Sequence, residues 1–122
     1  MLRIEFRDDF RGEDVLIITG ESADMQALSE ALHAWGACPA DTLVSSMVPA
    51  CEGVEITLQA HHLSCASTAS DSPAGVIWRI GEDAARHLAD LIGQLSQHPR
   101  PAHFYLDLEG HGRAIIISMD EY

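Results

Sequence analysis

The sequence of 122 residues contains no lysine, and all seven of its basic residues are arginines. Asparagine is also absent while alanine is abundant, a combination typical of a GC-rich coding sequence, so we attribute the missing lysine to codon bias. The acidic residues number 19, which gives a formal net charge of −12. Because phosphate groups are bound through basic side chains, this balance argues against nucleic acids and anionic membranes as partners. It permits a basic protein partner, since complementary charge speeds encounter, although acidic surfaces also serve solubility.

Long hydrophobic runs are missing as well. The longest, VLII at 15–18 and AIII at 114–117, are far shorter than the roughly 20 residues that a membrane-spanning helix needs. The first ten residues alternate apolar and charged side chains and so lack the apolar centre of a secretory signal. Three cysteines without regular spacing fit free thiols in a reducing compartment. We therefore expect one globular domain, residues 1–122, in the cytoplasm.

Recognisable catalytic and cofactor motifs are not found. The sequence has no Gly-x-Ser-x-Gly, and the glycines around His111 lack the third glycine and following helix of a phosphate-binding loop. His61, His62 and Cys65 are weak candidates for metal ligands, because imidazole and thiolate suit zinc. They form one block rather than two separated pairs, and adjacent histidines at a strand end point to opposite faces. We predict no metal site and no cofactor.

Hydrophobic periodicity predicts two amphipathic helices, at 20–36 and 81–99, each ending near a proline. Alternating or short apolar runs predict strands at 2–6, 15–19, 53–60, 76–80, 103–108 and 113–118. The stretch 41–53 is ambiguous, with an edge strand stopped by Pro49 as one interpretation. The stretch 61–75, rich in small residues and turn formers, is expected to be a surface loop.

These elements predict an α+β fold: a mostly antiparallel sheet of five to seven strands, with two amphipathic helices packed on one face. The other face should then meet solvent or a partner. A weak internal echo supports two related halves, because ITGESADMQALSEAL and WRIGEDAARHLADLI both run from a strand through Gly-Glu into a helix. Strand-to-helix turns often converge on such residues, so the echo alone does not establish a duplication.

Alternation reconstructs the uncovered face of this sheet. It should present Glu55, Thr57, Gln59, Ile77, Arg79, His103, Tyr105 and Asp107. In the last strand either the even positions 114–118 or the odd positions 115–119 face outward, and both sets leave isoleucine there. The row of His103, Tyr105 and Asp107 could support acid–base chemistry, because histidine titrates near neutrality, or it could be a recognition surface or a plain solvated face. An acidic and aromatic face with an apolar centre is typical of a protein-binding surface or a homodimer interface.

The tail, HFYLD followed by a turn and IISMDEY, resembles the endings of small bacterial proteins, some of them immunity proteins of toxin systems. The matching positions are His103, Tyr105, Leu106, Asp107, Ser118, Asp120, Glu121 and Tyr122. The resemblance implies no defined catalytic or binding residues. Our leading hypothesis is a non-enzymatic module that binds another protein, such as a basic toxin, through Glu55, Arg79 and the row from His103 to Asp107. The alternative is a small enzyme or ligand-binding domain that uses the His/Tyr/Asp row.

Overall fold

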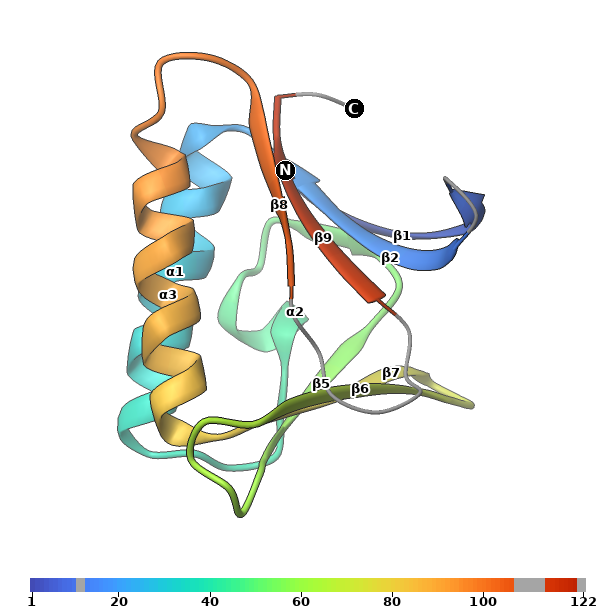
Figure 1. Cartoon of the computed structure of the whole chain (residues 1–122), viewed down its shortest axis with the longest axis vertical. Coiled ribbons are helices and arrows are strands. Elements are labelled where there is room, and N and C mark those ends of the chain that lie inside the picture. Colours follow the sequence, from blue (N-terminus) through green and yellow to red (C-terminus); the bar gives the residue numbers. More distant parts are fainter. Residues whose placement is uncertain (11–12, 107–113, 121–122) are drawn as a thin grey trace.

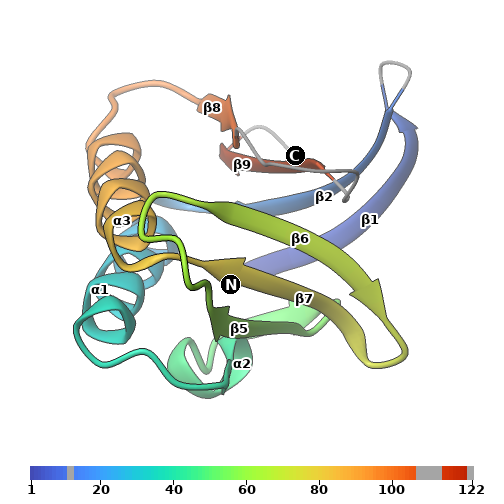
Figure 2. The same cartoon turned by 60° about the horizontal axis from the view of Figure 1, so that its bottom comes forward.

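The computed structural model of the chain describes residues 1–10, 13–106 and 114–120. Two long helices lie side by side and antiparallel along one flank, and two sheets extend from them (Figures 1 and 2). The elements in chain order are β1 (Leu2–Phe10), β2 (Glu13–Gly20), α1 (Ser22–Ala37), β3 (Thr42–Leu43), α2 (Val44–Met47), β4 (Cys51–Gly53), β5 (Ile56–Ala60), β6 (Ser67–Ser72), β7 (Gly75–Ile80), α3 (Glu82–Ser96), β8 (Ala102–Tyr105) and β9 (Ala114–Met119).

The α+β class is confirmed, but the expected single, mostly antiparallel sheet is wrong. Five strands form sheet A, in the order β4-β1-β2-β9-β8, and four form sheet B, in the order β3-β5-β7-β6. Both sheets are mixed, because β1 with β4, β2 with β9 and β5 with β7 pair in parallel. The physical reason is that each long helix carries the chain from one sheet to the other. After each helix, a strand therefore pairs in parallel with a strand of the other half. Local periodicity in the sequence does not predict such a pairing.

The two halves of the chain follow one plan. Each half consists of an antiparallel hairpin (β1–β2 or β6–β7), a long helix (α1 or α3) and two strands that join the sheet of the other half (β3 and β5, or β8 and β9). Without β4, sheet A reads β1-β2-β9-β8 and sheet B reads β6-β7-β5-β3, which is the same order of equivalent strands. The echo between the two strand-helix segments of the sequence thus corresponds to a repeated topology.

The two long helices also correspond to each other, position by position. All six buried residues of α1 precede a buried residue of α3 by 60 positions, as Met25 precedes Ala85. The pairs are Met25 and Ala85, Leu28 and Leu88, Ser29 and Ala89, Leu32 and Ile92, Trp35 and Leu95, Gly36 and Ser96. Small side chains let the helices approach closely, and the Ser29 hydroxyl donates a buried 2.7 Å hydrogen bond to the Ala89 carbonyl. The register of the two halves is therefore fixed at this helix contact.

One main core lies between the inner faces of the two sheets and the helices. Its largest fully buried side chain is Trp78, and leucines, isoleucines and valines from both sheets surround it. The predicted run VLII is buried on both faces of β2. Leu16 and Ile18 join the main core, while Val15 and Ile17 form a second cluster with Ile116 on the outer face of sheet A. Burial of this apolar surface is the main stabilising contribution.

The structure settles the choice that sequence left open for β9. Ile115, Ile117 and Met119 face the main core, and Ala114, Ile116 and Ser118 face outward. The apolar surface expected at this strand is not exposed, because Ile116 is only 1% accessible.

One segment differs from the prediction, and another that the sequence left ambiguous is now defined. The expected loop at 61–75 contains β6, whose sequence STASDS has almost no apolar alternation and is ordered by pairing with β7, where Ala69 lies opposite Trp78. The ambiguous stretch 41–53 forms β3, the single turn α2 and β4, which adds to the edge of β1. Across the described residues, no helix has the length and apolar character needed to cross a membrane.

Candidate binding site

The predicted row on the C-terminal strands lies on the outer face of sheet A. β8 places His103 opposite Ser118 and Tyr105 opposite Ile116, and both side chains are exposed. Their rings meet edge to face, with centroids 5.8 Å apart and planes at 80°. Asp107, the third member of the row, lies outside the described residues. The structure therefore brings together two of the three predicted side chains.

Glu55 and Arg79 lie on a different surface, the outer face of sheet B. Arg79 is exposed on β7 opposite Gln59 of β5, and Ile77 lies beside it opposite Thr57. The Glu55 carboxylate precedes β5 and accepts hydrogen bonds from the main-chain N–H, at 3.3 Å, and the hydroxyl of Ser45.

The single candidate surface that joined these two groups is therefore wrong. It assumed that the strands of Glu55 and Arg79 lie in one sheet with the strand of His103 and Tyr105. β5 and β7 pair with each other in sheet B, whereas β8 pairs with β9 in sheet A. The two outer faces point away from the shared core on opposite sides.

His61, His62 and Cys65 occupy the connection from β5 to β6. The histidine rings stack with centroids 4.7 Å apart, and the Leu63 N–H donates to His61 Nδ1 at 3.0 Å. Cys65 is exposed. Within the described ranges, no three His, Cys, Asp or Glu side chains gather where they could share a metal ion.

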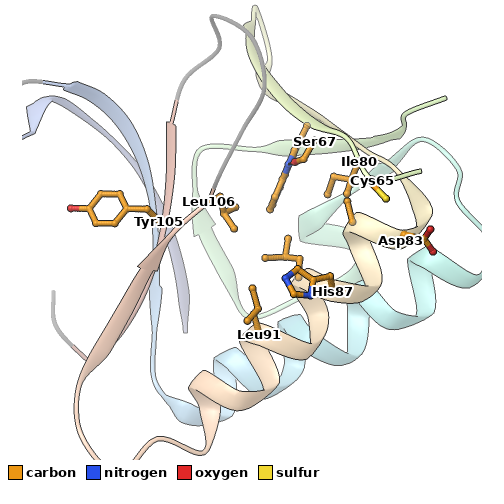
Figure 3. Close-up of a pocket in the computed structure, with 11 residues that line it drawn as sticks. Cys65, Ser67, Ile80, Asp83, His87, Leu91, Tyr105 and Leu106 are labelled. Atoms are coloured by element: carbon orange, nitrogen blue, oxygen red, sulfur yellow. Dashed lines mark hydrogen bonds between the residues drawn. The ribbon is translucent and has the colours of Figure 1, made fainter. Parts of the chain in front are cut away.

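A cavity of about 420 Å³ lies between α3, the start of β6 and the end of β8 (Figure 3). Its interior is apolar, and the described residues with apolar side chains along its wall are Trp78, Ile80, Ala84, Leu88, Leu91 and Leu106. Leu106 and Leu91 point into the space from opposite sides, whereas the Tyr105 ring points away from it (Figure 3). A volume of this size with apolar walls is in the range of small-ligand and side-chain binding pockets.

Polar groups are confined to the rim of this cavity. The Trp78 indole N–H donates to the Ser67 hydroxyl at 2.9 Å, so the one polar atom of that large side chain is satisfied. Asp83 accepts a 3.3 Å hydrogen bond from Arg86, and both side chains are exposed. His87 and Cys65 complete the rim. The interior therefore favours an apolar group, because the described side chains that line it are apolar and the polar ones lie at the rim.

The equivalent place in the first half of the chain is filled. There the gap between α1, the start of β1 and the end of β3 is closed by α2 and β4, and Val44 and Val48 are buried in the core. By the spacing of the helices, Ala31 is the counterpart of Leu91, and Ala31 packs against that core. By the strand register, Val44 follows Leu43 as Leu106 follows Tyr105. Among the described residues, the cavity is therefore the counterpart of a gap that α2 and β4 close in the first half.

Sequence reasoning did not find this cavity. Helical periodicity over 81–99 places Leu88 and Leu91 on one apolar stripe; Leu88 is buried, whereas Leu91 is half-buried. Ser67 lay in an expected loop, and nothing in its local sequence marks a strand edge. The sequence does contain one indication of the cavity. Once the two halves are known to be equivalent, the connection VSSMVPACEGVE at 44–55 can be compared with LDLEGHGR at 106–113, which is poorer in apolar residues.

No protein-family model, curated protein or solved structure matches this chain.

Proposed function

We propose that this chain is a non-enzymatic protein-binding module whose partner carries a positively charged surface. The observation that carries the proposal is the placement of its charge. Every aspartate and glutamate whose burial the structure describes is exposed or half-buried, on a chain of net charge −12. A field of one sign over a small domain accelerates encounter with a partner of the opposite sign.

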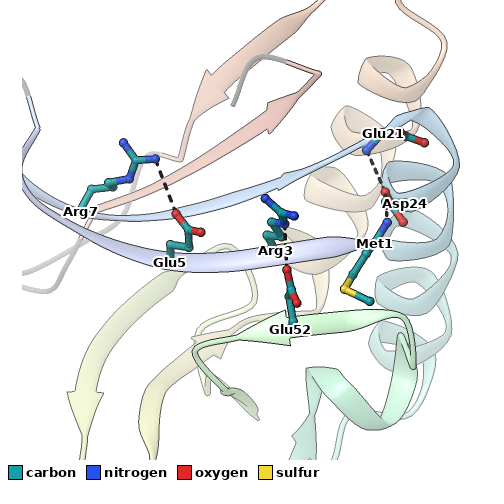
Figure 4. A network of polar contacts seen from close by, with 7 residues as sticks. All are labelled: Met1, Arg3, Glu5, Arg7, Glu21, Asp24 and Glu52. Carbon is teal, nitrogen blue, oxygen red and sulfur yellow. Dashed lines mark hydrogen bonds and ion pairs between the residues drawn. The ribbon is translucent and has the colours of Figure 1, made fainter.

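The few positive charges do little to offset this field. Arg3 lies 2.8 Å from Glu52 and Arg7 lies 3.6 Å from Glu5 on the surface of sheet A (Figure 4). Arg86 lies 3.3 Å from both Glu82 and Asp83 on α3. Such exposed pairs contribute at most about 1 kcal/mol to stability, so their main effect is to neutralise arginine locally. Arg79 and Arg100 are also exposed, but on the whole chain 19 acidic residues outnumber seven arginines.

The exposed aromatic edge of sheet A is the surface we assign to first contact. His103 and Tyr105 lie on β8, which is an edge strand, and Tyr105 is 48% exposed. Tyrosine is among the side chains that most often dominate binding energy in protein interfaces. A basic toxin neutralised by this module would be one partner of the required charge, in keeping with the resemblance of the tail to immunity proteins.

The alternative function, catalysis or ligand binding by the His/Tyr/Asp row, gains no support from the cavity. The Tyr105 ring points away from it, and His103 is not among the described residues that line it. The two rings stand on an exposed sheet face instead. A catalytic site would need a concave, water-excluding setting around these groups.

The test is capture from an extract of the native cell, followed by identification of the captured protein and measurement of its affinity. The dissociation constant should rise about tenfold between 0.05 M and 0.5 M salt, because exposed charges are screened. Tyr105→Ala should weaken binding by about tenfold. Leu43→Ala is the matched control, since Leu43 holds the equivalent position in the other half and is 45% exposed. A dissociation constant that does not change with salt concentration would contradict the proposal. So would the finding that this chain binds only to a second copy of itself.

A further inference from the structure

We propose that the cavity, together with the edge of β6 at Ser67, binds an extended apolar segment of the partner protein that runs parallel to β6. This inference rests on the proposed function only in taking the occupant to be a protein. It names a second surface, on the opposite side of β8 from the Tyr105 ring. The template for the occupant is the chain itself, which seats its own segment on the equivalent surface of the first half.

The main chain of Ser67 is placed to accept such a segment. Gly81 donates its N–H to the Ala66 carbonyl at 2.8 Å, so residues 66 and 81 form a hydrogen-bonded pair between β6 and β7. Hydrogen-bonding directions alternate along a strand, so the main-chain groups of the next residue, Ser67, face away from β7. Leu2 holds the same place on β1, and its N–H donates to the Ala50 carbonyl at 2.8 Å, next to β4. Among the described residues, none accepts a hydrogen bond from the Ser67 N–H. Within the described part of the chain, this donor therefore has no acceptor, whereas its counterpart in the first half has one.

The register shows that these two positions are equivalent. Ile4 lies opposite Ile18 on the first hairpin, and Ala69 lies opposite Trp78 on the second. Ile18 and Trp78 are 60 positions apart, the spacing that relates the buried residues of the two helices. Leu2 and Ser67 each precede the first member of their pair by two residues. A strand that added to Ser67 as β4 adds to Leu2 would be parallel to β6, because β4 is parallel to β1.

The connections beside the two gaps differ in composition. The connection from β3 to β5 brings Val44, Met47, Val48 and Cys51 against the core. The connection from β8 to β9, LDLEGHGR, supplies only two leucines among charged residues and glycines. Leu106 is the first of these and lines the cavity, which still measures about 420 Å³. An apolar residue supplied by another chain would complete the second half as Val48 completes the first.

The chemistry of the occupant follows from the walls and the rim. Its anchor is an apolar side chain such as valine, leucine or methionine, buried among Trp78, Leu88 and Leu91. A main-chain carbonyl next to the anchor accepts from the Ser67 N–H, which is the β-augmentation mode of peptide binding. A basic residue beside the anchor suits Asp83 on the rim and the negative charge of the chain.

The probe is a synthetic peptide with the sequence of residues 43–54 and Cys51→Ser, titrated into ¹⁵N-labelled protein. We expect amide shifts at Ser67 and at the Trp78 indole N–H, with Leu2 unchanged. Leu91→Glu, at a half-buried position on the cavity wall, should weaken peptide binding by about tenfold or more, because it places a charge in an apolar site. Gln94→Glu adds the same charge at an exposed position of α3 and should change the affinity less than about twofold.

Two control peptides separate the contributions of the anchor and the strand. A peptide with Val48→Asp should not bind, since its anchor is charged. A peptide N-methylated throughout, which disrupts pairing at the strand edge, should bind at least about tenfold more weakly than the parent. Absence of any shift at Ser67 at millimolar peptide, or binding that Leu91→Glu leaves unchanged, would overturn the proposal. Binding of free indole without binding of the peptide would also overturn it and would identify a small-molecule cavity.

These outcomes are independent of the test of the proposed function. If the captured partner binds with salt dependence but is indifferent to Leu91→Glu, the cavity inference fails and the protein-binding function stands. If the peptide binds at Ser67 but no partner binds with salt dependence, the electrostatic proposal fails and the cavity remains a peptide site.

Discussion

The two halves of this chain share strand order, helix register and buried positions, yet they close the space beside their long helices differently. In the first half, α2 and β4 cover the start of β1 and bury Val44 and Val48. In the second half, the described residues leave a cavity of about 420 Å³ beside the start of β6. Among the described residues, the repeated topology is therefore not accompanied by repeated packing. In the first half, the gap is closed by the apolar residues of the connecting segment.

One equivalent position on the two helices differs in size. Where the first half has Ala31 under its covering segment, the second half has Leu91. The larger side chain of Leu91 occupies part of the space beside α3 and forms part of the cavity wall. If the cavity is a binding site, substitutions at equivalent positions should affect stability strongly in the first half and weakly in the second.

The largest effect is expected from a charge placed at Val44. Val44→Asp should lower the free energy of unfolding by about 3 kcal/mol or more, because the carboxylate would be buried without a partner. Leu106→Asp, at the equivalent position, should cost about 1 kcal/mol, because Leu106 is half-buried beside open space. Urea denaturation of both variants measures the difference. Equal losses would mean that the second gap is packed as tightly as the first.

A smaller effect of opposite sign in the two halves is expected from added volume. Ala31→Leu should destabilise the protein by about 1–3 kcal/mol, since it inserts methylenes into the packed first half. Ala84→Leu, on the cavity wall, should leave stability unchanged or raise it by about 0.5–1 kcal/mol, as cavity-filling changes commonly do. Thermal denaturation midpoints compare the two variants. A loss of stability in Ala84→Leu would show that the cavity has no room for a side chain.

The smallest effect concerns the cysteine of the covering segment. Burial raises the pKa of the Cys51 thiol, and the nearby carboxylates of Glu55 and Glu52 raise it further. Cys51 should therefore react with an aromatic disulfide at pH 8 about tenfold more slowly than the exposed Cys38 and Cys65, as mass spectrometry of the labelled peptides would show. Comparable rates at all three sites would indicate that β4 does not stay docked.

The same pKa shift has a consequence for stability against pH. Because the folded state raises the pKa of Cys51, its thiol stabilises the fold below the ordinary thiol pKa, and this contribution is lost as the pH rises through the raised value. The wild type should thus lose more stability between neutral and alkaline pH than Cys51→Ala. Parallel curves for the two proteins would contradict this assignment.

Local patterns were sufficient for the elements but not for their assembly. The apolar stripe from Met25 to Trp35 predicts α1, and the alternation of Leu2 and Ile4 with charged residues predicts β1. Both patterns depend only on residues close together in the sequence. The parallel pairing of β2 with β9 joins residues about a hundred positions apart, so no local period reports it. β6 escaped prediction because serine and alanine neither favour a strand nor mark its faces.

For the candidate surface, the sequence predicts which way each side chain points but not which side chains lie together. The outward direction of His103 and Tyr105, and of Glu55 and Arg79, follows from alternation along each strand. That these two groups lie on different sheets depends on the helix crossings, which alternation does not specify. The cavity lies beside a connection with only two leucines, and its counterpart in the first half can be recognised only from the register that relates the two halves.

Amide hydrogen exchange at Leu2 and Ser67 tests the central contrast most directly, because these two N–H groups occupy equivalent positions beside a filled gap and an unfilled one. In the free protein, the Leu2 amide, which donates to Ala50, should exchange about a hundredfold more slowly than the Ser67 amide. Saturation with the peptide of residues 43–54 should slow Ser67 and leave Leu2 unchanged. A Ser67 amide already as protected as Leu2 in the free protein would contradict the account, since the second half would then be as closed as the first.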